Sequence, residues 1–385
     1  MNKVEEKINN LINNKKTLLG VGPMSLNCVD ASIELADQYK VPIILIASRR
    51  QIDAESFGGG YVNKWTTEKF SQYVKKKSKT KNILLARDHG GPWQNESEIK
   101  KNLSLSKALE SAKKSFEIDI LNDFSFIHID TSVDIKNNIN FEKSIDRLFE
   151  LYEHCYNFSK KNKKKILFEI GTEEQSGSTN NFEDLQMTLN KLSKFCKKNK
   201  LPKVTFVVAQ AGTKVMERKN IGSFESPVRI KNEIPVEIHL IKTLEICNKN
   251  HVYMKEHNAD YLKTDSLKWH PRLGIHAANV APEFGVCETL KFIEIMKRFN
   301  LNKYIDKFIE ISFKSYKWKK WVIDESKISD FNKAILSGHY VFSNDEFLEL
   351  KKSVQRKLGK INIDNILKSE VKLSIKRYLK SFELI

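Results

Sequence analysis

NILLARDH (residues 82–89) is a short apolar run that ends on an acid and a histidine, and two glycines follow it. Seven more runs of this kind occur in the first 285 residues: TLLGVGP (17–23), VPIILIAS (41–48), FSFIHIDT (124–131), KILFEIGT (165–172), KVTFVVAQ (203–210), HVYMKEHN (251–258) and GIHAANVAP (274–282). Runs this short and this continuously apolar are typical of strands that are buried on both faces of a parallel sheet.

Segments with apolar residues at three- and four-residue spacing separate the runs, for example CVDASIELADQYK (28–40) and FEKSIDRLFELYEHCYNF (141–158). Eight strands that alternate with helices over about 250 residues predict an α/β fold of the (β/α)8, or TIM-barrel, type. The alternative is an open doubly wound sheet, but GVGPMS (20–25) lacks the glycine pattern that such a sheet needs after an early strand.

No strong strand pattern follows residue 302, and the remaining segments have helical periodicity. We therefore predict a barrel domain over residues 1–302 and a helical C-terminal extension over residues 303–385. The extension is expected to pack on the barrel or to serve self-association.

The chain of 385 residues is 40% hydrophobic and carries a formal charge of +18. Its lysines are scattered and no nucleic-acid motif is present, so we expect a solvated basic surface and no nucleic-acid partner. No apolar run reaches the roughly 20 residues of a membrane helix, and the first residues lack the pattern of a signal peptide. We expect a cytoplasmic protein with no membrane partner, whose five widely spaced cysteines are reduced.

Polar side chains stand at the ends of six consecutive apolar runs. In a (β/α)8 barrel the C-terminal strand ends form one mouth, where the chemistry takes place. Each residue taken alone is no more than an ordinary buried polar group, but together they predict a metal site. They are Asp88, His89, His128, Asp130, Glu169, Glu173, Gln210, His257, Asp260 and Asn279.

Imidazoles combined with carboxylate or amide oxygens suit a borderline divalent ion. We expect Zn²⁺ first, with Mn²⁺ and Co²⁺ as alternatives. An open coordination position would let the ion act on a substrate carbonyl as a Lewis acid.

Six segments resemble the class II D-tagatose-1,6-bisphosphate aldolase family, in particular its accessory (Z) subunit branch, which includes related hexulose-phosphate 4-epimerases. The resemblance runs in order along nearly the whole chain. The segments are LARDHGGP (85–92), FIHIDTS (126–132), EIGTEEQSG (169–177), VVAQAGTKV (207–215), HNADYLKTDSL (257–267) and GIHAANVAPEFGVCETL (274–290). The resemblance implies a divalent-metal-dependent barrel enzyme.

Carried over by position, the resemblance makes His89 and His257 metal ligands and Glu173 a carboxylate of the site. Gln210 stands where the aldolases have another histidine, and it completes the implied ligand set. Asp88 corresponds to the catalytic acid/base, for which Glu173 and Asp130 are the next candidates. Two departures concern the substrate mouth: Ala47 replaces a glutamate, and NVAPEFG (279–285) replaces a KVGP-like segment.

Further residues are predicted to bind the substrate. Arg49 or Arg50 would bind an anionic group, because arginine can donate two parallel hydrogen bonds to it, although a surface ion pair is an equal alternative. Gly90 and Gly91 are expected to make the turn that lets both Asp88 and His89 face the site. The other predicted substrate contacts are Gly59, Gly60, His128, Gly212, Asp260 and Asn279.

Three functions remain open from the sequence. The first is aldol and retro-aldol chemistry on a ketose or ketose phosphate. The second is 4-epimerisation, in which the aldehyde fragment is retained and added back on its other face. The third is a non-catalytic subunit that stabilises a class II aldolase. The expected partners are a sugar or sugar phosphate, together with a second copy of the chain or an aldolase subunit.

Overall fold

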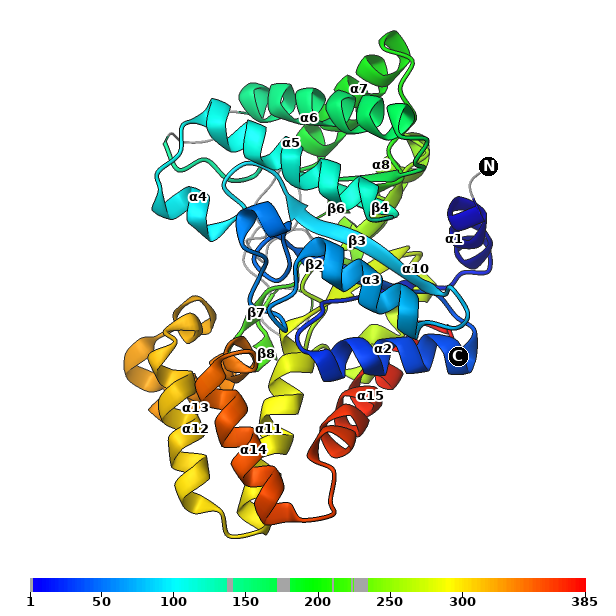
Figure 1. The fold of residues 1–385 in the computed structure, drawn as a ribbon. Helices are drawn as coiled ribbons and strands as arrows, with labels where there is room; N and C mark the ends of the chain where they lie inside the picture. The colour runs from blue at the N-terminus through cyan, green and yellow to red at the C-terminus, as the bar shows by residue number, and fades with distance from the viewer. Residues whose placement is uncertain (1–2, 137–140, 172–180, 210, 223, 225–234) are drawn as a thin grey trace.

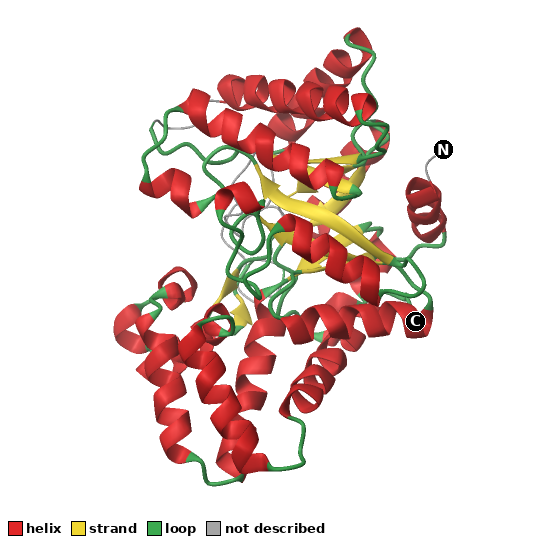
Figure 2. Ribbon diagram, viewed as in Figure 1, coloured by secondary structure: helices red, strands yellow, loops and turns green. Residues whose placement is uncertain are grey.

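A computed structural model of the chain describes residues 3–136, 141–171, 181–209, 211–222, 224 and 235–385. All eight predicted runs form strands, and these close into a parallel barrel in the order β1-β10-β9-β6-β5-β4-β3-β2. The strands lie in the middle of the molecule, between helices (Figures 1 and 2). The predicted TIM barrel is thus confirmed. The barrel strands are β1 (Leu18–Val21), β2 (Ile43–Ser48), β3 (Ile83–Gly90), β4 (Phe126–Asp130), β5 (Leu167–Gly171), β6 (Phe206–Ala209), β9 (Tyr253–Glu256) and β10 (Ala277–Val280).

Helices surround the strands, as Figure 2 shows in red around the yellow barrel. The main ones are α2 (Leu26–Tyr39), α3 (Thr67–Lys77), α5 (Leu105–Leu121), α6 (Phe141–Lys161), α7 (Phe182–Lys198), α8 (Val236–Lys249) and α11 (Pro282–Arg298). The shorter elements between strands are η1 (Glu55–Phe57), α4 (Glu96–Lys100), the hairpin β7 (Val215–Met216) with β8 (Lys219–Asn220), α9 (Thr264–Leu267) and α10 (Trp269–Leu273).

Apolar side chains fill the N-terminal half of the barrel interior. Ile44, Leu84, Phe126 and Phe206 belong to one buried cluster there. The N-terminal helix α1 (Lys3–Asn13), which was not predicted, packs Ile8 into the same cluster. Because apolar side chains fill this half of the interior, the barrel is open to substrates only from its C-terminal mouth in the described part of the chain.

Residues 303–385 are helical, as predicted. We call the part from α12 to α14 the helical cap. It has its own core, in which Phe292 of α11 contacts the rings of Phe308 and Phe347. The cap consists of α12 (Asn302–Lys314), η2 (Lys317–Trp321), η3 (Glu325–Lys327), α13 (Asp330–Ser337), η4 (Gly338–Val341) and α14 (Asp345–Leu358).

The last helix, α15 (Ile363–Ser381), runs back to the barrel and lies beside α2 (Figure 1). Its residues Val371, Ile375 and Tyr378 belong to the barrel core and not to the cap core. The extension is therefore shared between two cores, and the domain boundary at residues 302/303 stays a prediction.

A bulge in β3 positions the pair that ends NILLARDH. Arg87 pairs with Ile127, but the next partner of β4 is Ile129, and it pairs with Gly90. Two residues of β3 therefore stand where β4 has one, which turns both Asp88 and His89 toward the mouth.

The left-handed backbone at this point belongs to His89, with φ of 45°, and not to the glycines that were predicted to make the turn. The glycines are needed for space. A Cβ on Gly90 would lie 2.3 Å from the Phe116 ring, and one on Gly91 would lie 2.0 Å from the carbonyl oxygen of Asp130.

In the described part of the chain, no helix combines the length and the apolarity that a membrane crossing requires. All five cysteines are free thiols, and four of them are buried.

Candidate metal centre and its cavity

Four buried side chains from four strand ends converge at the mouth of the barrel. Asp88, His128, Glu169 and His257 each offer one ligand atom, and these atoms all lie within 4.8 Å of one another. Asp88 Oδ1 is 3.4 Å from His128 Nδ1 and 3.7 Å from His257 Nε2. Glu169 Oε1 is 3.5 Å from His257 Nε2 and 3.7 Å from His128 Nδ1. Ligand atoms in a tetrahedral Zn²⁺ site are roughly 3.3 Å apart, so this spacing fits a single ion.

Unpaired buried atoms support the same conclusion. Within the described residues, Glu169 Oε1 and His257 Nε2 have no hydrogen-bond partner, and Asn279 Oδ1 beside them has none. His128 Nε2 is also unpaired but lies against Gly171, whereas its Nδ1 faces the cluster. A buried polar atom without a partner costs roughly 1–3 kcal/mol, so a cluster of such atoms indicates a bound group. The donors are imidazole and carboxylate, which suits a borderline divalent ion.

The surroundings favour the protonation states that metal binding requires. Burial opposes ionisation of Asp88, but the charge of His89 is the largest of the effects that hold its pKa well below the usual range. Burial likewise acts against ionised Glu169, but the ammonium group of Lys255 lowers the pKa of Glu169 to about 2. For His257, burial lowers the pKa and so favours the neutral imidazole, which is the form that binds a metal.

Lys255 was not predicted as part of the site. Its Nζ lies 2.7 Å from Glu169 Oε2, and both side chains are almost completely buried. The ion pair occupies Oε2 and leaves Oε1 directed at the two imidazoles. Lys255 lies on β9, two residues before His257, so strand alternation places both on the same face and is the signal that would have found it.

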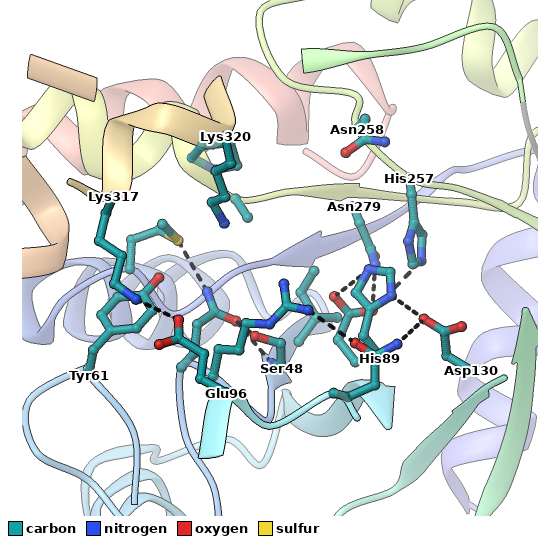
Figure 3. Close-up of a pocket in the computed structure, with 18 of the residues that line it drawn as sticks. Ser48, Tyr61, His89, Glu96, Asp130, His257, Asn258, Asn279, Lys317 and Lys320 are labelled. Atoms are coloured by element: carbon teal, nitrogen blue, oxygen red, sulfur yellow. Dashed lines mark hydrogen bonds and ion pairs between the residues drawn. The ribbon is translucent and has the colours of Figure 1, made fainter. Parts of the chain in front are cut away.

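His89 lies beside this cluster and was predicted as a metal ligand. Its Nδ1 is 2.6 Å from Asp130 Oδ2, and its Nε2 is 3.8 Å from Asp88 Oδ2. Burial lowers the pKa of His89, but Asp88 and Asp130 outweigh burial and raise it to about 9. Its backbone N–H donates to His128 Nδ1 at 3.2 Å. Figure 3 shows His89 linked to Asp130, with His257 and Asn279 next to it.

The ligands predicted from the sequence therefore overlap only in part with the cluster that the structure brings together. His257 is common to both. Glu173 and Gln210 lie outside the described residues. His128 was predicted to bind substrate, and Glu169 was noted only as a strand end, yet both face the centre.

Asn279 and Asp260 line the cavity as predicted substrate contacts. Asn279 Nδ2 donates to Asp88 Oδ1 at 3.4 Å, and Gly20 leaves room for it, because a Cβ there would lie 2.2 Å from Asn279 Oδ1. Asp260 accepts the backbone N–H groups of Ala281 and Glu283 at the start of α11. Burial and the Glu283 carboxylate raise the pKa of Asp260 to about 7.

The two arginines after β2 have different surroundings. Arg49 is buried outside the cavity, where it forms ion pairs with Asp53 at 2.9 Å and Glu98 at 2.7 Å. Arg50 lines the cavity. The geometry thus leaves Arg50 as the residue able to contact a substrate.

The predicted glycine contacts lie away from the cavity wall. Gly59 and Gly60 pack against the carbonyl oxygens of Trp65 and Gln51, where a Cβ would lie 2.8 and 2.1 Å away. Gly212 has a left-handed φ of 78°, and the close approach of Gly222 to its carbonyl oxygen leaves no room for a Cβ on Gly222. These glycines shape loops.

The centre opens into a cavity of about 560 Å³, which is large enough for a sugar. Barrel loops form one part of its wall. The cap forms another part through residues that the sequence did not point to, namely Lys317, Lys320, Trp321 and Tyr340.

No family model and no curated protein matches the chain. Among solved structures, a probable tagatose 6 phosphate kinase from Sinorhizobium meliloti 1021 has a TM-score of 0.69 and 16% identity, covering 95% of this chain and 100% of that one. The fructose-bisphosphate aldolase of Campylobacter jejuni has a TM-score of 0.56 and 12% identity, with 99% and 94% covered. The YdjI aldolase of Escherichia coli K12 has a TM-score of 0.50 and 12% identity, with 98% and 96% covered. At these identities the likeness establishes a shared barrel fold, and the resemblance to the accessory-subunit branch stays a prediction.

Proposed function

We propose that this chain is a divalent-metal-dependent enzyme that cleaves and forms the C3–C4 bond of a ketose or ketose phosphate. The observation that carries the proposal is the buried cluster of two imidazoles and two carboxylates at the mouth of an aldolase-like barrel. In the proposal His128, Glu169 and His257 would hold the ion, and Asp88, the fourth member of the cluster, is the base. Zn²⁺ is the ion we expect first. When bound, it would supply Lewis-acid polarisation of the ketose carbonyl.

The residues of the chain supply the proton transfer. Asp88 is held ionised and lines the cavity, so it can accept the proton of the substrate's C4 hydroxyl. As that proton leaves, C4 becomes an aldehyde carbon, the C3–C4 bond breaks, and its electron pair passes toward C2 to give an enediolate. The reverse reaction returns the proton from Asp88 to the C4 oxygen.

The neighbours of Asp88 hold it in place and balance its charge. Asn279 donates to its Oδ1, while His89 stands near its Oδ2. Asp130 orients His89, and it also accepts from Gln94 at 3.0 Å and from the backbone N–H of Ser132 at 2.9 Å. A positioned base with fixed partners avoids reorganisation during the reaction.

Epimerisation at C4 is the second candidate. The cap helps to enclose a cavity large enough to hold both fragments of a cleaved hexose. An aldehyde that stays in the cavity can rotate and be attacked on its other face. The same residues then give the 4-epimer in place of two trioses.

A purely structural subunit is the least favoured function. The unpaired atoms Glu169 Oε1 and His257 Nε2 face each other, and leaving them without a metal ion, a water or another ligand costs stability. A subunit that only stabilised a partner would gain nothing from this arrangement.

The test is to follow candidate ketoses by NMR with the Zn²⁺-loaded and the metal-free protein. The substrates are several ketohexoses, each tested as the free sugar, the monophosphate and the bisphosphate. We expect metal-dependent conversion, with triose products for an aldolase and a 4-epimeric ketose for an epimerase. If no ketose is converted although the ion is bound, the proposal is contradicted and a stabilising subunit becomes the favoured function.

A further inference from the structure

One side of the cavity wall is basic and aromatic, and nothing in the proposed proton transfer uses it. We call it the basic wall, and Figure 3 shows its Lys317 and Lys320 across the cavity from His257 and Asp130. The barrel loop after β2 and the cap contribute to it together. Its residues are Arg50, Tyr61, Lys317, Lys320, Trp321 and Tyr340.

The positive charge of the basic wall is only partly neutralised. Lys317 Nζ lies 2.5 Å from Glu96 Oε1, so this ion pair joins the cap to the barrel. Arg50 donates weakly to the side-chain amide of Gln94, at 3.5 Å. No carboxylate of the described residues lies within ion-pair distance of Arg50 or Lys320. Arg50 and Lys320 therefore face the cavity without a direct ion pair, although Glu96 lines the same cavity and its carboxylate interacts with the charge of Arg50.

Aromatic contacts hold Lys320 in position. Trp321 Nε1–H donates to the Tyr340 hydroxyl at 3.1 Å, and the Tyr340 ring lies 4.7 Å from that of Tyr61. Lys320 Nζ stands 4.4 Å from the centre of the Trp321 ring. A lysine side chain held over an indole ring has already lost part of its conformational entropy. Binding an anion therefore costs it less entropy.

We propose that the basic wall binds a terminal anionic group of the substrate, a phosphate or a carboxylate, at the end remote from the metal centre. The proposal rests on the proposed function, because it takes the reacting carbonyl to lie at the metal centre. Arg50 can donate two parallel hydrogen bonds to such a group, and Lys320 adds a point charge. The cap is then part of the substrate site, and the two elements of the wall are both needed to form it.

The alternative is that Lys320 is one of the many solvated lysines of a basic surface. Lys319 provides the matched comparison. It belongs to the same short helix η2 and is also exposed and placed against aromatic rings, but it does not line the cavity. An anion site in the cavity requires Lys320 and is indifferent to Lys319.

The first measurement is the binding of inorganic phosphate to the metal-free protein, read by calorimetry and by the fluorescence of the tryptophans. The proteins are the wild type, Lys320→Met, Arg50→Met and Lys319→Met. We expect each of the first two variants to weaken phosphate binding roughly tenfold, while Lys319→Met stays within about twofold of the wild type. Phosphate bound equally by Lys320→Met and Lys319→Met would overturn the proposal.

The second measurement separates the two sources of the anion and is made with the metal-loaded protein. Three forms of one sugar are compared as ligands: the neutral ketose, its terminal phosphate and its terminal carboxylate. The form whose affinity falls roughly tenfold in Lys320→Met shows whether the wall binds a phosphate or a carboxylate. If the neutral ketose loses as much affinity as the charged forms, an anion site is contradicted. Phosphate binding needs neither metal nor turnover. If the basic wall fails to bind phosphate, the proposed reaction is therefore not affected. If instead no ketose is converted, phosphate binding can still be measured.

Discussion

Asp88→Asn is expected to lower ketose turnover by roughly 100-fold or more, while the protein still binds one divalent ion. Asparagine has the shape of aspartate and keeps an oxygen that can accept the hydrogen bond from Asn279 Nδ2. It cannot take a proton at the pH of the assay. The loss would therefore report the missing base and not a displaced side chain.

The measurement is kcat on an identified ketose, combined with elemental analysis of the same samples. Asp130→Asn serves as the comparison, because it removes the negative charge of the partner of His89 Nδ1 and leaves Asp88 in place. Near-normal turnover in Asp88→Asn would show that the proton goes elsewhere, with Asp130 next in line. Loss of the metal together with activity would make Asp88 a ligand and contradict its role as the base.

His257→Ala is expected to weaken divalent-metal binding by about 100-fold or more, because it removes one of the three side chains that would hold the ion. His128→Ala should have a comparable effect. The result for His128→Ala distinguishes the observed cluster from the ligands that the sequence predicted, because the sequence prediction made His128 a substrate contact.

The matched control is His251→Ala, which changes an exposed histidine just before the same strand. Dissociation constants for Zn²⁺ and Co²⁺ should be the same in this variant and in the wild type. If His257→Ala retains wild-type affinity, the assignment of the centre is wrong.

The fold was predictable because its signal is local. Runs such as those around Ile44 and Phe206 are short and apolar on both faces, which is the pattern that a buried parallel strand requires. The strand ends also indicated which residues lie near the mouth, while the roles of these residues stay predictions. Asp88, His257 and Asn279 lie there as the sequence indicated.

The exact ligand set was less predictable, since it depends on strand register. A bulge after Arg87 turns Asp88 and His89 to the same side, and residue alternation alone cannot reveal such a bulge. The depth of His128 in the barrel is likewise set by its pairing with Glu169 across β4 and β5. These are properties of neighbouring strands and not of one segment.

The cap's contribution to the cavity could not be predicted from any local pattern. The ion pair between Lys317 and Glu96 joins residues that are 221 positions apart. Lysines are common in this chain, and most of them are solvated, so sequence alone gives no reason to select Lys255, Lys317 or Lys320. Burial and tertiary contacts distinguish them.

The most direct test of the metal centre is a titration of the metal-free wild-type protein with Co²⁺, followed by absorption spectroscopy and checked by elemental analysis. We predict one ion per chain, a visible spectrum typical of nitrogen and oxygen ligands without thiolate bands, and displacement by Zn²⁺. A titration that shows no stoichiometric binding, or that is identical in the wild type and in His257→Ala, would contradict the proposed centre.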